Sequence, residues 1–132
     1  MSPEQMIKSA ILAQAIEQEA VSIAEPVTKE NIDELYEASS GEYQLQDFEM
    51  EFREGQVETN IAPPSSRHYE SKSVATQMAD GSWIGWTYWY GGGKHAEPES
   101  IDWMSEAYAL ACVEEQKVMT VRTFSKSEAR AA

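Results

Sequence analysis

The stretch from residue 82 to residue 95, SWIGWTYWYGGGKH, constrains this chain more than any other. It places five aromatic side chains within residues 83–90 and follows them with three glycines, Lys94 and His95. Aromatic residues favour β-strands, and glycine adopts backbone angles that other residues avoid. We therefore predict a strand over residues 83–90 that enters a glycine loop, and we expect this loop to approach a ligand or a partner closely.

A β-hairpin is predicted around this strand because turn-forming residues precede it. Asp80 is followed by Gly81, a pair that is typical of tight hairpin turns. Residues 68–78 then form the first arm and residues 83–90 the second. The alanines of residues 107–115 favour a helix, whereas the alternation that continues into residues 117–124 favours a second hairpin. We predict the hairpin, with residues 107–115 still compatible with either a helix or a strand.

Two short helices are predicted at the beginning of the chain. Ser2 and Gln5 have the spacing of a capping box, and apolar residues continue at helical spacing until Pro26 excludes the helix. Thr28 as an N-cap and Gly41 just past the end delimit the second predicted helix.

From residue 43 the hydrophobic pattern changes to alternation. Apolar side chains at positions 48, 50 and 52 alternate with Asp47, Glu49 and Glu51. This period of two predicts a half-buried strand with an acidic outer face. Gly55 permits a turn before a short strand over residues 57–61, and the prolines within residues 62–66 predict an exposed connection.

These elements predict an α+β fold. Two N-terminal helices pack on a mainly antiparallel sheet of four or five strands. A chain of 132 residues suffices for one domain with a substantial core, which we place at residues 1–125. Residues 126–132 are predicted to be a frayed tail.

The charge is strongly negative and unevenly distributed. Twenty-three acidic residues stand against 10 Lys and Arg, and residues 1–58 alone hold 14 acidic and 3 basic residues. Proteins that bind nucleic acid use cations to displace counterions from phosphates. Direct binding to DNA or RNA is therefore disfavoured, and a basic protein is the partner that this charge predicts.

Cysteine content and the first residues bear on localisation. The only cysteine, Cys112, permits no disulfide within the chain and excludes cysteine-rich zinc patterns. Its apolar neighbours predict a buried, inert thiol. The chain begins with neither a basic signal-peptide pattern nor a long apolar run. We therefore expect a cytoplasmic protein without a membrane segment.

No complete catalytic motif is present. The glycine loop lacks the residues that a P-loop places before its lysine, and no Ser or Thr follows Lys94. The carboxylates near His95 lack the spacing of a zinc site. No metal and no cofactor are predicted.

The leading hypothesis is therefore a small, acidic, non-catalytic binding or inhibitor protein that acts on a basic protein partner, for example an accessory protein of a mobile element. Its predicted acidic binding face comprises Asp47, Glu49 and Glu51. The alternative is a small-ligand-binding protein or an enzyme with a pocket at the aromatic strand and glycine loop, formed by Trp86, Tyr88, Tyr90, Gly92, Lys94 and His95. The aromatic side chains equally suit a core, or the interface of a homodimer.

Overall fold

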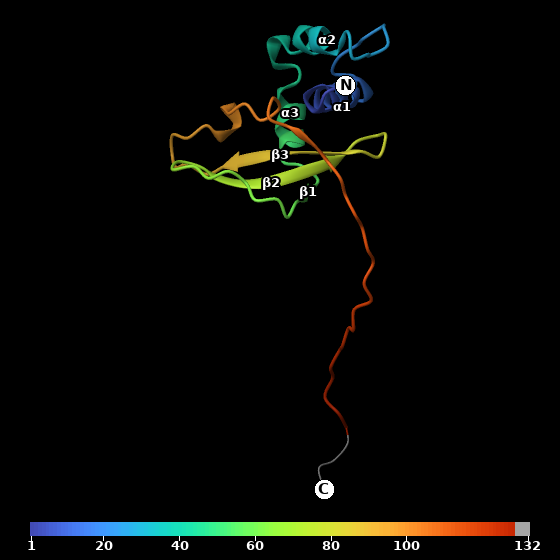
Figure 1. Ribbon diagram of the computed structural model, residues 1–132, viewed down its shortest axis with the longest axis vertical. Coiled ribbons are helices and arrows are strands. Elements are labelled where there is room, and N and C mark those ends of the chain that lie inside the picture. Colours follow the sequence, from blue (N-terminus) through green and yellow to red (C-terminus); the bar gives the residue numbers. More distant parts are fainter. Residues whose placement is uncertain (129–132) are drawn as a thin grey trace.

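The computed structural model describes residues 1–128 and has an α+β architecture (Figure 1). In chain order the elements are α1 (Pro3–Glu17), α2 (Ile32–Ser39), the 3-10 helix η1 (Gly41–Tyr43), α3 (Gln46–Arg53), β1 (Val57–Glu58), β2 (Glu70–Gln77), β3 (Trp83–Tyr90), the 3-10 helix η2 (Pro98–Ser100) and β4 (Tyr108–Leu110). The strands form a four-stranded antiparallel sheet in the order β1-β2-β3-β4. The predicted fold class and sheet type are confirmed.

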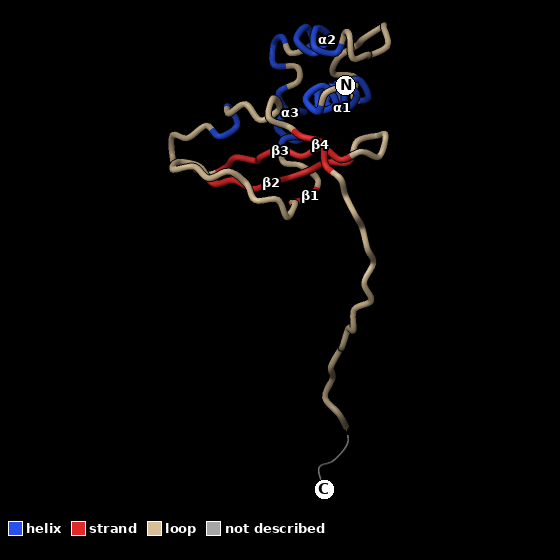
Figure 2. Tube along the Cα trace, in the orientation of Figure 1, coloured by secondary structure: helices blue, strands red, loops and turns tan. Residues whose placement is uncertain are grey.

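The helices gather on one face of the sheet. Figure 2 shows α1 and α3 next to the strands, while α2 lies on the far side of α1 from the sheet. Buried apolar side chains of α1, α2, β2 and β3 form a continuous core between these layers. We call the helix-covered side of the sheet its inner face and the opposite side its outer face.

The predicted hairpin is present as β2 and β3. The two strands pair from Gln77 opposite Trp83 to Glu70 opposite Tyr90. In the turn, the Asp80 carboxylate accepts hydrogen bonds from the Ser82 hydroxyl at 2.6 Å and from the Ser82 backbone N–H at 2.9 Å, which lowers the pKa of Asp80. Gly81 has a φ of 90°, a conformation that favours glycine.

The start of α1 follows its sequence signal. Ser2 Oγ accepts a hydrogen bond from Gln5 N at 3.1 Å, and Gln5 Oε1 accepts one from Ser2 N at 2.9 Å, which completes the capping box. The helix ends earlier than its apolar spacing indicates, at Glu17, and Glu19 turns the chain with a φ of 61°. The N-cap of α2 is Asn31 instead of the predicted Thr28, whose carbonyl accepts the Asn31 and Ile32 N–H groups.

The predicted strand over residues 48–52 is wrong, because these residues belong to α3. Leu45, Phe48 and Phe52 are spaced by three and four residues, so a helix places them on one face, and all three contribute to the core. Met50 belongs to the alternating pattern, but it does not lie on this helical face, and it is 43% exposed. Burial of the helical face therefore decides the structure of this segment.

The chain leaves the sheet after β4. Tyr108–Leu110 form the strand β4, but none of the residues 111–128 belongs to a helix or a strand, so the predicted second hairpin is wrong. Figure 1 shows this segment extending far from the rest of the molecule, and we call residues 111–128 the C-terminal arm and residues 1–110 the body. Cys112, predicted to be buried, is exposed because it lies on this arm. Residues 129–132 of the predicted tail lie outside the described residues.

Candidate interaction surfaces

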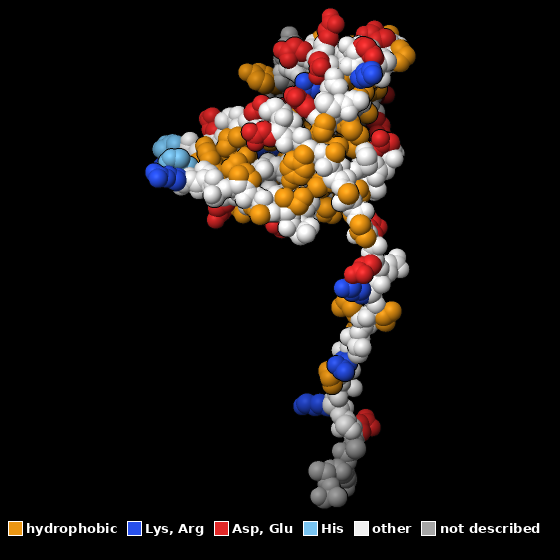
Figure 3. All heavy atoms as spheres, in the orientation of Figure 1, with side chains coloured by type: hydrophobic (Ala, Val, Ile, Leu, Met, Phe, Trp, Pro, Cys, Tyr) orange, Lys and Arg blue, Asp and Glu red, His pale blue; other side chains and the backbone are white. Residues whose placement is uncertain are grey.

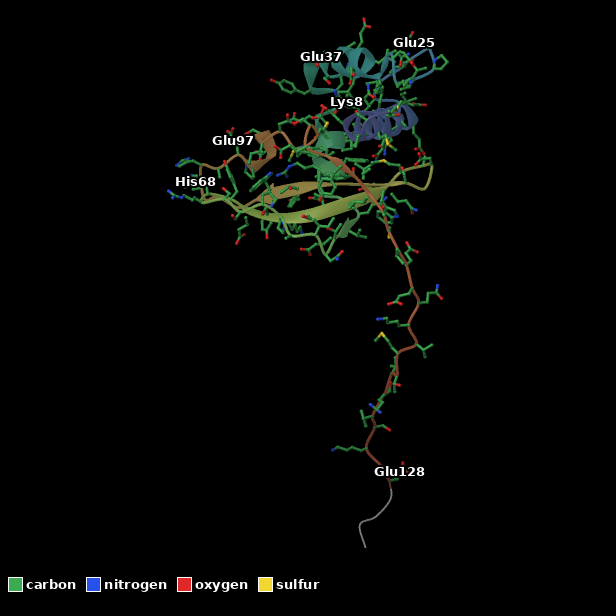
Figure 4. All side chains as sticks on the ribbon, viewed as in Figure 1. Lys8, Glu25, Glu37, His68, Glu97 and Glu128 are labelled. Atoms are coloured by element: carbon green, nitrogen blue, oxygen red, sulfur yellow. The ribbon has the colours of Figure 1, made fainter. Side chains whose placement is uncertain are left out.

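Exposed carboxylates cover the helices. Figure 3 shows acidic side chains around α2 and its neighbouring loops, and Figure 4 places Glu37 and Glu25 there. We define the acidic helical surface as the exposed carboxylates of α2, α3 and the residue after α3, namely Asp33, Glu34, Glu37, Asp47, Glu51 and Glu54. It replaces the acidic strand that the sequence predicted.

Basic residues among the first 58 do little to neutralise this surface. Lys8 Nζ lies 3.1 Å from Asp33 Oδ1 and 3.5 Å from Glu4 Oε1. Burial alone would lower the pKa of Lys8, but these carboxylates outweigh it and raise the pKa. The hydrogen bond from Lys8, followed by one from Gln5, lowers the pKa of Asp33. Lys8 is thus engaged with two of the fourteen acidic residues.

Glu49 does not share a face with Asp47 and Glu51. Its Oε1 accepts a hydrogen bond from the Tyr36 hydroxyl at 2.5 Å, and the residue is half-buried. Burial, followed by this hydrogen bond, raises the pKa of Tyr36 well above its ordinary value. Asp47 and Glu51, one helical turn apart, are exposed. Of the three predicted acidic residues, Glu49 therefore makes a packing contact, whereas Asp47 and Glu51 face solvent.

Trp86 lies in the core on the inner face of β3. Its side chain is 0% exposed, with its ring 5.5 Å from that of Phe52 and 5.2 Å from that of Trp103. The indole N–H donates to the Arg53 carbonyl at 2.8 Å. Trp86 is therefore a core residue, which is one of the alternatives that the sequence left open.

Tyr88 and Tyr90 continue the inner face beyond the core. Their rings stack at 5.6 Å and remain half-buried. Lys72 Nζ lies 5.4 Å from the Tyr88 ring centroid and 5.9 Å from that of Tyr90, distances at which a cation is attracted to an aromatic face. Of the predicted site residues, these two form a partly accessible aromatic pair.

Arg53 is the important residue that the sequence prediction missed. It is 5% exposed, its guanidinium lies 4.6 Å from the Tyr88 ring centroid, and its Nη2 donates to the Trp89 carbonyl. Arg53 therefore connects the end of α3 to β3. Its partners follow more than 30 residues later, so no local pattern in the sequence indicates this contact.

The glycine loop is closely packed at one position and open beyond it. Gly92 has a φ of 91°, and a Cβ added there would lie 2.6 Å from Ala96 Cβ and 2.8 Å from the Tyr69 ring. Lys94 and His95 are exposed. In Figure 3 the histidines gather beside Lys and Arg side chains at this end of the sheet, where Figure 4 labels His68. The loop thus presents a cationic tip and is not joined to the buried Trp86.

No metal centre is evident in this region. Within residues 1–128, no three His, Cys, Asp or Glu side chains lie close enough together to hold an ion. Nor does that part of the chain contain a helix that is both long and apolar enough to span a membrane.

An open groove of about 420 Å³ lies on the outer face of the sheet. Residues 57–61 form one side, Ala75 and Trp83 lie between, and residues 110–113 form the other side. A second hollow, of about 390 Å³, includes Lys72 and Tyr88. Neither hollow includes the glycine loop. We call the first the outer-face groove.

The chain matches no family model, no curated protein and no solved structure.

Proposed function

We propose that this chain is a non-catalytic binding protein whose acidic helical surface engages a basic protein. The observation that carries the proposal is the excess of exposed carboxylates on the helical layer. Residues 1–58 contain three basic residues, of which Lys8 contacts Glu4 and Asp33, and Arg53 is buried against Tyr88. Lys29 is the exposed basic residue that remains.

A surface of this kind acts mainly on association. Unneutralised carboxylates on one side of a molecule attract a cationic partner over distances comparable to the Debye length, and they raise the on-rate more than the contact energy. The partner chemistry that fits best is a cationic site built to receive phosphates. By occupying such a site, the chain would inhibit a nucleic-acid-binding protein, as a cytoplasmic accessory protein of a mobile element would do.

The test compares two charge reversals of equal size. The double variant Asp47→Lys with Glu51→Lys changes the acidic helical surface. The control, Glu97→Lys with Glu99→Lys, changes two exposed carboxylates, one just before η2 and one within it, and Figure 4 shows Glu97 away from α2. Basic proteins are recovered on the immobilised parent chain, and their association rates are measured at low and high salt.

We expect the α3 variant to slow association by roughly ten-fold or more at low salt and to flatten its salt dependence. The control variant should slow association less, because its charges lie farther from the contact. If the α3 variant associates at the parent rate, or if both variants slow association equally, the acidic helical surface is not the binding site.

The alternative function is favoured by one observation, the cationic tip at the glycine loop. There, an anionic small molecule would meet exposed Lys94 and His95. Inorganic phosphate and a nucleotide serve as probes in a thermal-shift measurement, since a ligand that binds only the native state raises its apparent stability. A shift in the parent that Lys94→Ala abolishes would support this function, and no shift in the parent would reject it for these ligands.

A further inference from the structure

The C-terminal arm carries apolar side chains that the body does not cover. Its five large apolar residues are 78–103% exposed: Val113, Val118, Met119, Val121 and Phe124. Soluble proteins rarely leave such side chains together in water unless they contact another molecule. Valine, threonine and phenylalanine also favour extended structure, so this segment suits a strand-like contact.

The outer-face groove offers a matching apolar site. Trp83 and Leu110 contribute the larger apolar side chains, and Val57 and Ile61, both more than 40% exposed, lie along the opposite side. No helix covers this face in Figures 1 and 2. The arm begins at the groove, because Ala111, Cys112 and Val113 form part of its wall.

The arm is poorly suited to fill the groove of its own body. Its first residues already form the wall, so it would have to reverse direction directly after Val113. Tight reversals favour Gly, Pro, Asn or Asp, and residues 111–128 contain none of these. Figure 2 instead shows the arm leading away from the sheet.

Charge favours a second copy of this chain as the acceptor. Residues 116–127 contain Lys117, Arg122 and Lys126 and no acidic residue, whereas the body contains 20 acidic and 6 basic residues. Lys117 Nζ lies 3.1 Å from Glu115 Oε1 within the arm, so Arg122 and Lys126 are the cations that a second copy would meet. The distal arm and the body are therefore electrostatically complementary.

We propose that two copies of this chain form a dimer by exchanging their C-terminal arms, each arm lying in the outer-face groove of the other copy. In each copy, the first residues of its own arm form one wall of the groove. The arm of the second copy would therefore lie beside the arm of the copy that binds it. A two-fold axis between the two arms makes both contacts identical, as in most homodimers. The apolar side chains of the arm then contact Trp83 and Ile61 of the second copy.

The first test measures the mass of the full-length chain in solution. Sedimentation should give twice 14.8 kDa at micromolar concentration. The variant Val121→Ser with Phe124→Ser should raise the dissociation constant at least about ten-fold, since each large apolar side chain loses its buried contact. The control Thr120→Ser with Thr123→Ser should dimerise like the parent. Thermal unfolding confirms that both variants retain the body fold.

The second test locates the arm. A photo-cross-linking phenylalanine analogue replaces Phe124 in a mixture of unlabelled and heavy-isotope-labelled chains. Cross-linked peptides that join one labelled and one unlabelled chain, and that include residues 57–61 or Trp83, support the exchange. A monomeric parent at every soluble concentration, a dimer indifferent to the serine variant, or cross-links confined to one chain or to another surface would each overturn it.

Discussion

The two faces of β3 carry similar aromatic residues in different surroundings. On the inner face, Trp86 is fully enclosed by Phe52 and Trp103 under the helices. On the outer face, Trp83 and Trp89 are half-buried, and Figure 1 shows no helix on this side of the sheet. An aromatic cluster therefore does not by itself mark a binding site, because the layer above each face determines whether its aromatic side chains are core or surface.

The largest test of this comparison is Trp86→Ala. Removing a fully buried aromatic side chain from a packed interior costs about 3–5 kcal/mol. The variant would also remove the donor to the Arg53 carbonyl. Urea denaturation should show this loss as a lower midpoint with an unchanged slope. A midpoint equal to that of the parent would contradict the enclosure of Trp86.

The next effect concerns Tyr36, which belongs to the helical layer above the inner face. Tyr36→Phe removes the hydroxyl that donates to Glu49, and hydrogen bonds to charged groups contribute about 1.5–3 kcal/mol. Chemical denaturation at neutral pH measures this loss. Glu34→Gln, a change at an exposed carboxylate of the same helix, serves as the control and should leave the free energy of unfolding nearly unchanged.

The stabilisation that the Tyr36 hydroxyl provides should also depend on pH. The pKa of Tyr36 is raised in the folded state, so its contribution is complete below the ordinary tyrosine pKa of 10.0 and declines as the pH rises above that value. The phenylalanine variant lacks this decline. The stability difference between the parent and the variant should therefore narrow above pH 10.0. A constant difference would contradict the raised pKa.

A smaller effect distinguishes two neighbouring glycines at the end of β3. Gly92 and Gly93 have nearly equal φ values of 91° and 90°, but a Cβ at Gly92 would meet Ala96 and Tyr69, whereas one at Gly93 meets nothing within 4 Å. Both alanine variants incur the same backbone strain. Gly92→Ala should therefore unfold about 1–2 kcal/mol more easily than Gly93→Ala because of overpacking. Equal stabilities would contradict the close packing of the loop.

The smallest effect is expected for Trp89→Ala on the outer face. Its side chain is half-buried, and its carbonyl, which Arg53 contacts, is retained in the variant. We expect a loss below about 1.5 kcal/mol, since less apolar surface returns to water than for a buried side chain. A loss equal to that of Trp86→Ala would mean that the outer face is as well covered as the inner one.

Local signals made part of this fold predictable. The capping box at Ser2 and the turn at Asp80 involve residues within three positions of one another. All partners of these contacts are therefore visible in a short stretch of sequence. The segment from residue 46 to residue 53 fits either a period of two or a helical face through Leu45, Phe48 and Phe52. The contact between Phe52 and Trp86 lies outside any local pattern, and it favours the helix.

The candidate surfaces were less predictable because they depend on distant contacts. Net charge in residues 1–58 located the acidic region, but the helix separates Glu49 from Asp47 and Glu51. The aromatic run predicted β3 correctly. Trp86 is a core residue, however, because the helices cover the inner face of the sheet, and the run itself does not indicate which face they cover. Nothing near Arg53 in sequence indicates that its guanidinium lies against Tyr88.

The contacts at the end of α3 have a consequence for the order of folding. A helix of eight residues is only marginally stable alone in water, and the same residues alternate in a way that suits a strand. The contacts that favour the helix, from Phe52 and Arg53 to β3, exist only once the β2–β3 hairpin has formed. We therefore expect the β2–β3 hairpin to form before α3. The segment of α3 would become helical late, when it docks onto this hairpin, although the ribosome synthesises α3 first.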